Sequence, residues 1–158
     1  MDINRTYFKF LAFSILLLFQ ALHAYDDQPV CYRDLQLYFF KPELVGQALS
    51  AHNVYQSQWF LVNQQLEERS KDVPRRVKER AERYGIHNPL QNPFNAPVAA
   101  KILWEVLYEI FREVMNLHNI TNASDTREMF EYIQLGQKDY IESCLGIEIR
   151  PTKRQEDS

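Results

Sequence analysis

One stretch of the chain, residues 95–118 with the sequence NAPVAAKILWEVLYEIFREVMNLH, constrains the fold more than any other. When it is placed on a helical wheel, its polar and charged side chains fall within an arc of about 120°. These side chains are Lys101, Glu105, Glu109, Arg112, Glu113 and Asn116. The rest of the circumference is apolar or aromatic, whereas an ordinary surface helix exposes a broad polar face. The segment therefore predicts a long central helix that its neighbours enclose.

Residues that favour helix termini mark the ends of this predicted helix. Asn95 can accept hydrogen bonds from the free N–H groups of the first turn. Pro97 fits that turn because the N–H that proline lacks has no helical partner there. A polar run begins at Asn119. At this length the helix should extend roughly 36 Å, so we expect the other helices to pack around it.

Composition supports an all-α fold. The chain has only four glycines, and its β-branched residues are scattered, which favours helices over sheets. Aromatic residues make up 13% of the chain and can fill a core of good size. We expect a compact bundle of about four to five helices in a single domain, residues 25–149, followed by a flexible tail, residues 150–158. The net charge of −3 gives no reason to expect a nucleic-acid partner.

The first 24 residues have the pattern of a secretory signal peptide. Arg5 and Lys9 precede an apolar run at residues 11–19, and Ala24 is a small residue at the expected cleavage point. The apolar run is short for a membrane span, although an uncleaved signal anchor is the alternative. The pattern predicts a secreted or periplasmic protein without further membrane contact.

The residues before the central helix are predicted to be mainly helical. Apolar positions at three- and four-residue steps favour one long helix from Pro42 to about Lys71, with a possible break near Asn53. In residues 25–41 the alternation of Leu35, Leu37 and Phe39 suggests a strand. A lone strand would have no partner, so we prefer an irregular or helical lead-in that packs on the bundle.

Capping residues and glycines define two further helices. Asp72 can cap a short helix with Pro74 in its first turn. Asp125 and Glu128 resemble the capping box that begins a helix. Glycines are expected to end or kink these helices at Gly85, Gly136 and Gly146.

Two cysteines follow the predicted signal peptide, Cys31 and Cys144. In an exported chain they are expected to form a disulfide that ties the lead-in to the last helix. The alternative is a pair of unpaired, buried thiols.

A proline-rich loop is the one stretch whose composition suggests more than a scaffold. Residues 87–96 read HNPLQNPFNA, and their prolines exclude a regular helix or a central strand. We consider Leu90, Asn92 and Phe94 as candidates for a binding loop, since loops commonly carry function.

Motifs for catalysis, metals and cofactors are missing from the sequence. Neither a Gly-x-Ser-x-Gly elbow nor a glycine-rich phosphate loop occurs, and no histidine has the helical spacing of a metal site. Glu105, Glu109 and Glu113 form a row, but Lys101 and Arg112 share its arc, which indicates a solvated polar strip. Acidic residues likewise interleave with the basic residues of 69–83, again typical of a solvated face. We therefore expect no catalytic residues, no metal and no cofactor.

Two sequons for N-glycosylation follow the central helix. They begin at Asn119 and Asn122, and they matter only if the protein is eukaryotic. The same polar residues also suit a turn between two helices.

The leading functional hypothesis is an exported, non-enzymatic helical protein that binds another macromolecule, and the expected partner is another protein. Such a protein could be an accessory component of an envelope or secretion assembly, or a secreted effector. One alternative is a carrier of a lipid or other apolar ligand between helices, since the chain has many aromatic residues that could line a pocket. They are Tyr55, Trp59, Phe94, Trp104, Tyr108 and Phe111. The other alternative is an exported hydrolase, for which His87 is the histidine of interest.

Overall fold

The computed structural model describes residues 30–86 and 96–149, together with residues 6, 7, 9, 11, 12 and 14. The predicted signal-peptide cleavage site, the proline-rich loop and the C-terminal tail therefore lie outside the described residues. Within residues 30–149, the described part of the chain forms helices and contains no strand, which confirms the all-α prediction. None of the helices described is both long enough and apolar enough to cross a membrane.

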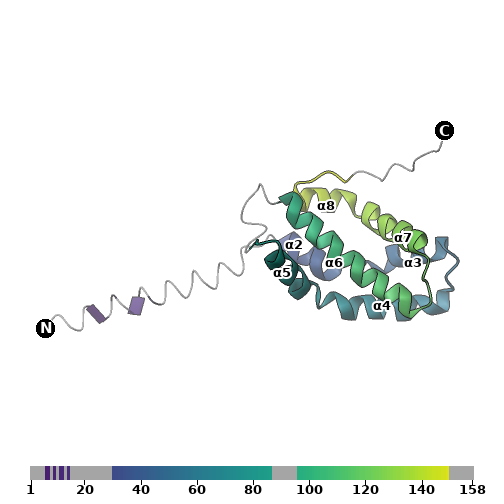
Figure 1. Ribbon diagram of the computed structural model, residues 1–158, viewed down its shortest axis with the longest axis horizontal. Helices are drawn as coiled ribbons and strands as arrows, with labels where there is room; N and C mark the ends of the chain where they lie inside the picture. Colours follow the sequence, from purple (N-terminus) through teal and green to yellow (C-terminus); the bar gives the residue numbers. More distant parts are fainter. Residues whose placement is uncertain are drawn as a thin grey trace.

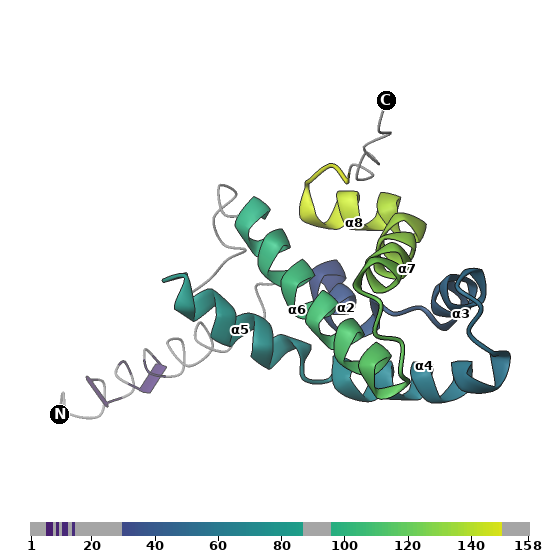
Figure 2. The ribbon, with the colours of Figure 1, turned by 45° about the vertical axis from the view of Figure 1, so that its right-hand side comes forward.

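The helices are arranged around α6, which runs diagonally through the molecule (Figures 1 and 2). α6 packs on α4, α5 and α7, whereas α2 contacts α4, α5 and α8, and α3 contacts α4 and α7. Their bounds are α2 (Val30–Tyr38), α3 (Pro42–Ala51), α4 (Gln56–Ser70), α5 (Val73–Arg83), α6 (Ala96–Leu117), α7 (Ala123–Gly136) and α8 (Lys138–Leu145). The bounds of α6 lie within one residue of those predicted for the central helix, 95–118. Asn95, its predicted cap, is not described.

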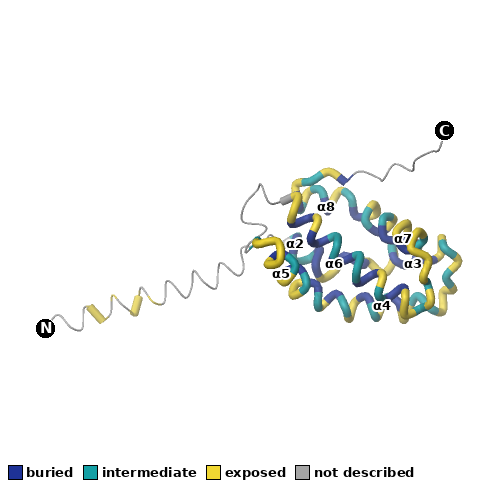
Figure 3. Tube along the Cα trace, in the orientation of Figure 1, coloured by how far each residue is buried: buried dark blue, intermediate teal, exposed yellow. Residues whose placement is uncertain are grey.

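The apolar arc of α6 supplies the centre of the core, as its helical wheel predicts (Figure 3). Eight of its large side chains are fully buried: Ile102, Leu103, Val106, Leu107, Ile110, Phe111, Val114 and Met115. Trp104 and Tyr108 complete the arc and are half-buried against the same core. The other helices contribute side chains that pack on these eight residues. Truncating one of the eight side chains would therefore leave a cavity at the centre of the fold.

The structure has more and shorter helices than the four or five expected, because two predicted long helices are divided. The helix predicted from Pro42 to about Lys71 breaks into α3 and α4. At the break Asn53 has a φ of 60°, and the N–H of Val54 donates to the carbonyl of Leu49 at 3.0 Å. The sequence anticipated a break near Asn53 as a possibility only, since apolar spacing continues across it.

Gly136 marks the second division, where α7 ends and α8 begins. A Cβ at Gly136 would lie only 2.6 Å from a methyl carbon of Leu44, so the missing side chain lets α3 and α7 approach closely. The predicted kink or split at this glycine is therefore confirmed, and its cause is a close helix–helix contact as well as weak helix propensity.

The lead-in is helical, and its strand-like alternation is misleading. Tyr32, Leu35 and Phe39 are buried at three- and four-residue spacing, whereas Leu37 is exposed. α2 thus presents one apolar face to α4, α5 and α8. The preference for a helical lead-in over a strand is confirmed.

Two predicted caps are wrong in their chemistry. α7 begins after Asn122, whose Oδ1 accepts from the backbone N–H groups of Ser124 at 2.9 Å and Asp125 at 3.1 Å. Asp125 therefore lies inside the first turn and does not begin a capping box. Asp72 does precede α5, but its carboxylate makes no cap and instead accepts hydrogen bonds from arginine side chains. The predicted helix ends at Gly85 and Gly146 are confirmed, since both have positive φ.

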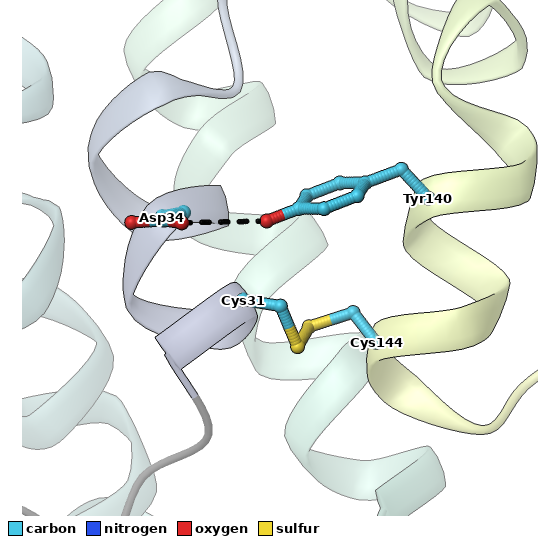
Figure 4. The surroundings of a disulfide bond; sticks show 4 residues. All are labelled: Cys31, Asp34, Tyr140 and Cys144. Carbon is cyan, nitrogen blue, oxygen red and sulfur yellow. Dashed lines mark hydrogen bonds between the residues drawn. A yellow bond between two sulfur atoms is a disulfide. The ribbon is translucent and has the colours of Figure 1, made fainter.

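The structure pairs Cys31 with Cys144, as predicted. The bond joins the first turn of α2 to the last turn of α8, and the two Cα atoms lie 5.7 Å apart, a usual separation for a disulfide. Beside it, the hydroxyl of Tyr140 on α8 donates to Asp34 on α2 at 3.5 Å (Figure 4). The two ends of the described domain are thus covalently linked.

Candidate binding surface

Two charged faces that the sequence predicts to be solvated meet each other in the structure. Arg76 of α5 donates to both carboxylate oxygens of Glu113 on α6, at 2.9 and 3.2 Å. Arg69 of α4 donates to the same carboxylate at 2.6 Å. One turn away, Arg80 donates to Glu109 at 2.6 Å. The row of carboxylates on α6 is therefore a half-buried clamp to α4 and α5, which corrects the expectation of two separate solvated strips.

Hydrogen bonding within this clamp stabilises the charged forms of its carboxylates. The hydrogen bond from Arg76 lowers the pKa of Glu113, and burial opposes this shift. Asp72 accepts from Arg75 and Arg76, which lowers its pKa to about 2. A general acid at neutral pH needs a raised pKa, so these carboxylates have the wrong environment for that role.

The described histidines are engaged with neighbouring side chains. Nε2 of His118 lies 2.7 Å from the side-chain oxygen of Gln65. The two ring nitrogens of His52 lie 3.6 Å from Asp125 and 3.7 Å from Glu128, so each faces a different carboxylate. In the described part of the chain, no group of three or more His, Cys, Asp or Glu side chains is placed to hold a metal. His87, the histidine of interest for the hydrolase hypothesis, lies outside the described residues.

The aromatic residues considered for an apolar-ligand pocket do not line a common cavity. Phe111 is fully buried and stacks on Phe40 with ring centroids 5.8 Å apart. Trp104 packs against Phe39. Tyr55 is instead 77% exposed on the outside of the molecule. Phe94 is not described. The described members of this set therefore belong partly to the core and partly to the surface.

Three large apolar side chains at the beginning of α4 are exposed to solvent. Tyr55 is 77% exposed, Phe60 74% and Leu61 50%. The core of α4 is formed instead by Val62 and Leu66 on its opposite face. Large aromatic side chains left in water are common at the centres of protein interfaces, where tyrosine and tryptophan contribute much of the binding energy. We refer to Tyr55, Phe60 and Leu61 as the α4 patch.

A surface hollow lies along α3 and includes Trp59 of α4. It has a volume of about 720 Å³, is open to solvent and is lined by Pro42, Glu43, Gly46, Gln47, Ser50, Ala51 and Trp59. We refer to these seven residues as the α3 hollow. Gly46 is buried beneath the indole ring of Trp59, and a Cβ at Gly46 would lie 3.2 Å from that ring. The absence of a side chain at Gly46 thus allows the ring to lie against α3.

A second hollow of about 460 Å³ borders the beginning of α6. Apolar side chains and the stems of charged ones line it: Pro97, Ala100, Lys101, Trp104, Glu105 and Ile147. Like the α3 hollow it opens to solvent, whereas a carrier for an apolar ligand would enclose most of the ligand surface.

The remaining predicted site residues fall into two groups. Leu90, Asn92 and Phe94 lie outside the described residues, so the binding-loop hypothesis stays a prediction. Asn119 is exposed after α6 with a φ of 60°, and Asn122 is the cap of α7. Both sequons therefore lie in a surface connection, and their use for glycosylation also stays a prediction.

The environment predicted for Tyr55 and Trp59 from the sequence, a continuous buried face, is wrong. In a continuous helix from Pro42 to Lys71 they would extend the buried apolar face. The break after α3 places Tyr55 in the connection and turns Trp59 back against the preceding helix. The positive φ of Asn53 is compatible with its residue type, because asparagine tolerates the left-handed region, and this was the one local signal for the break.

Comparison with protein-family models, curated proteins and solved structures gives no match for this chain. Its function is therefore argued from the geometry of the described residues.

Proposed function

We propose that this chain is an exported, disulfide-stabilised helical protein that binds another protein and has no catalytic role of its own. Roles of this kind include an accessory component of an envelope or secretion assembly and a secreted effector. The observation that carries the proposal is the α4 patch, in which Tyr55 and Phe60 are each about three-quarters exposed. Exposing two such side chains forgoes roughly 2 kcal/mol of burial for each, a cost that a binding surface would explain.

Two features support the exported location. A disulfide between Cys31 and Cys144 persists in oxidising compartments such as the periplasm or the extracellular space. The first 24 residues have the order of basic, apolar and small residues that signal peptidases recognise. N-terminal sequencing of the native protein should therefore find Tyr25 as its first residue. An intact Met1 on a cytoplasmic species would contradict the export.

Site-specific crosslinking in the native host tests the binding role. A photoreactive phenylalanine analogue replaces Phe60, whose exposed position tolerates substitution. The matched control carries the same analogue at Tyr84, an exposed aromatic residue that follows α5. We expect position 60 to give a discrete covalent adduct with one protein and position 84 to give none.

Two outcomes would contradict the binding role of the α4 patch. One is the absence of an adduct at position 60 under conditions in which the analogue is incorporated and the protein is folded. The other is an identical set of adducts from positions 60 and 84, which would indicate random collisions. A lipid adduct at position 60 would favour the carrier hypothesis in its place.

A further inference from the structure

We infer that the α3 hollow binds a lysine or arginine side chain on a basic segment of the partner protein. This inference rests on the proposed function, because it names the chemistry of the partner that the α4 patch would contact. Three observations carry it: the state of the Trp59 indole, the distribution of charge around the hollow, and the pairing of the chain's own cations.

Trp59 offers the hollow an aromatic surface and no hydrogen-bond donor. Its indole N–H donates to the carbonyl of Val54 at 3.1 Å, within the connection between α3 and α4. Part of the ring lies against Gly46, which fixes its position. A half-buried indole held in this way can attract a cation through its negative π face, and tryptophan is the strongest such partner among the aromatic residues.

The polar groups around the ring include several hydrogen-bond acceptors. Glu43 contributes a carboxylate that has no ion-pair partner among the described residues. The side-chain oxygen of Gln47 already accepts from the hydroxyl of Tyr132 at 2.8 Å, but an amide oxygen can accept a second bond. Ser50 adds a hydroxyl. A lysine or arginine carries several donors and no acceptor, so it complements this set.

The charge of the surrounding helices favours the same class of ligand. Residues 42–68, which include α3 and most of α4, contain three glutamates and no lysine or arginine. α7 adds Asp125 and Glu128, which face His52 at the end of α3. Lys41, just before the hollow, is the nearest cation in the sequence. An anionic partner such as nucleic acid or an acidic membrane would be repelled by this end of the molecule.

A second copy of the chain is a weaker candidate, because many of the cations in the described residues are engaged within the chain. α5 lies at the opposite end of the molecule from α3 (Figure 1). The basic side chains there and at the end of α4 form ion pairs within the chain: Arg69, Lys71, Arg75, Arg76 and Arg80. We therefore assign the α3 hollow a cation from a different protein, and the exposed side chains of the α4 patch can supply apolar contact for the rest of that segment.

Binding of defined peptides tests this inference. The probe is a helical peptide of leucine and lysine, and its control has glutamate in place of every lysine. In a Trp104→Phe background, Trp59 is the sole tryptophan, and its fluorescence reports binding directly. We expect saturable binding of the lysine peptide and no response to the glutamate peptide.

Charge changes of opposite sign locate the binding site. Glu43→Lys should lower the affinity for the lysine peptide about tenfold, and Lys41→Glu should raise that affinity severalfold. Glu68→Lys is the matched control, since Glu68 is an exposed glutamate on α4 outside the hollow. It makes the same change in net charge and should leave the affinity within about twofold, because screening weakens distant charges. Trp59→Phe removes the fluorescent reporter, so its affinity is measured by calorimetry, and it should also be weaker while circular dichroism shows a folded chain.

Several results would overturn the inference. Equal loss of affinity in Glu43→Lys and Glu68→Lys would show unspecific electrostatic attraction. Equal binding of both peptides would show that the hollow takes an apolar ligand. A dimer in sedimentation that shields Trp59 without peptide would show that a second copy of the chain occupies the hollow. If the adduct at position 60 forms equally well with Glu43→Lys in the native host, this inference fails and the proposed function stands. If no adduct forms with either chain, the proposed function fails as well.

Discussion

Removing the Cys31–Cys144 disulfide should destabilise the fold strongly without unfolding it. The perturbation is the double variant Cys31→Ala and Cys144→Ala, which deletes the bond and leaves two small apolar side chains. The bridge closes a loop between residues 113 apart in the sequence. Because the bond restricts the unfolded chain far more than the folded one, its effect grows with the length of that loop.

The chain-entropy relation gives the magnitude. For a loop of this length the unfolded state loses about 16 cal/mol/K, which corresponds to about 5 kcal/mol at room temperature. This is an upper value, since compact denatured states already restrict the chain. For a domain of this size, the same free energy lowers the melting temperature by roughly 20 °C.

Urea unfolding of three samples measures this effect. They are the oxidised protein, the same protein in a reductant, and the double variant. We expect the last two to share a lower midpoint, and the double variant to be insensitive to the reductant. Mass spectrometry of the oxidised chain should show it about two mass units lighter than the reduced chain, because disulfide formation removes two hydrogen atoms.

A small difference would refute this reasoning. If the oxidised protein and the double variant differ by less than about 1 kcal/mol, the bridge does not restrict the unfolded chain as the loop length requires. α2 would then be held mainly by noncovalent contacts, including those of Tyr32, Leu35 and Phe39 and the Tyr140–Asp34 hydrogen bond. Alkylation of both thiols in the protein purified from its native host would show that the bond does not form there at all.

Three further predictions concern the core, a cap and the charged clamp. Leu107→Ala should cost about 2–5 kcal/mol in urea unfolding, because Leu107 is fully buried on α6, and a loss below about 1 kcal/mol would contradict its central place. Asn122→Ala should cost about 1 kcal/mol through loss of the α7 cap, whereas Asn122→Asp should retain most of the stability. Glu113→Gln leaves Arg69 and Arg76 without their carboxylate and should cost about 1 kcal/mol at neutral pH, a modest value because all three side chains are partly solvated. The folded state lowers the pKa of Glu113, so its contribution is complete above its ordinary value of 4.5 and is lost as the pH falls below it. Acidification should therefore lower the free energy of unfolding more for the wild-type chain than for Glu113→Gln. If urea unfolding shows the same loss of stability on acidification for both chains, the clamp is contradicted.

The parts of the fold that the sequence predicts well are those with local signals. The limits of α6 follow from a proline in its first turn and a polar run after its end. Pro42 begins α3, and Gly146 ends α8 in the left-handed conformation, each for reasons confined to one turn of chain. Pairing of the two cysteines also follows from the sequence, since the chain has only two.

The charged clamp is not predictable in this way because its partners are remote. Arg76 and Glu113 are separated by 37 positions and lie on different helices. On each helical wheel alone, mixed charges indicate a solvated face. Whether two such faces meet depends on the packing of α5 against α6, which apolar residues such as Val77 and Ala81 determine. The arginine and carboxylate pattern then follows from the register of that packing.

The α3 hollow exists because of a departure from the local pattern. Gly46 and Trp59 are 13 positions apart, so in one continuous helix they would lie about 20 Å from each other along the axis. The break around Asn53 reverses the chain and brings the indole of Trp59 onto Gly46. The apolar face of the predicted helix is thereby divided, and Tyr55 and Phe60 remain exposed. Natural chains tend to depart from local consistency where function requires it, and here the departure creates the aromatic and acidic surface that we assign to a basic partner.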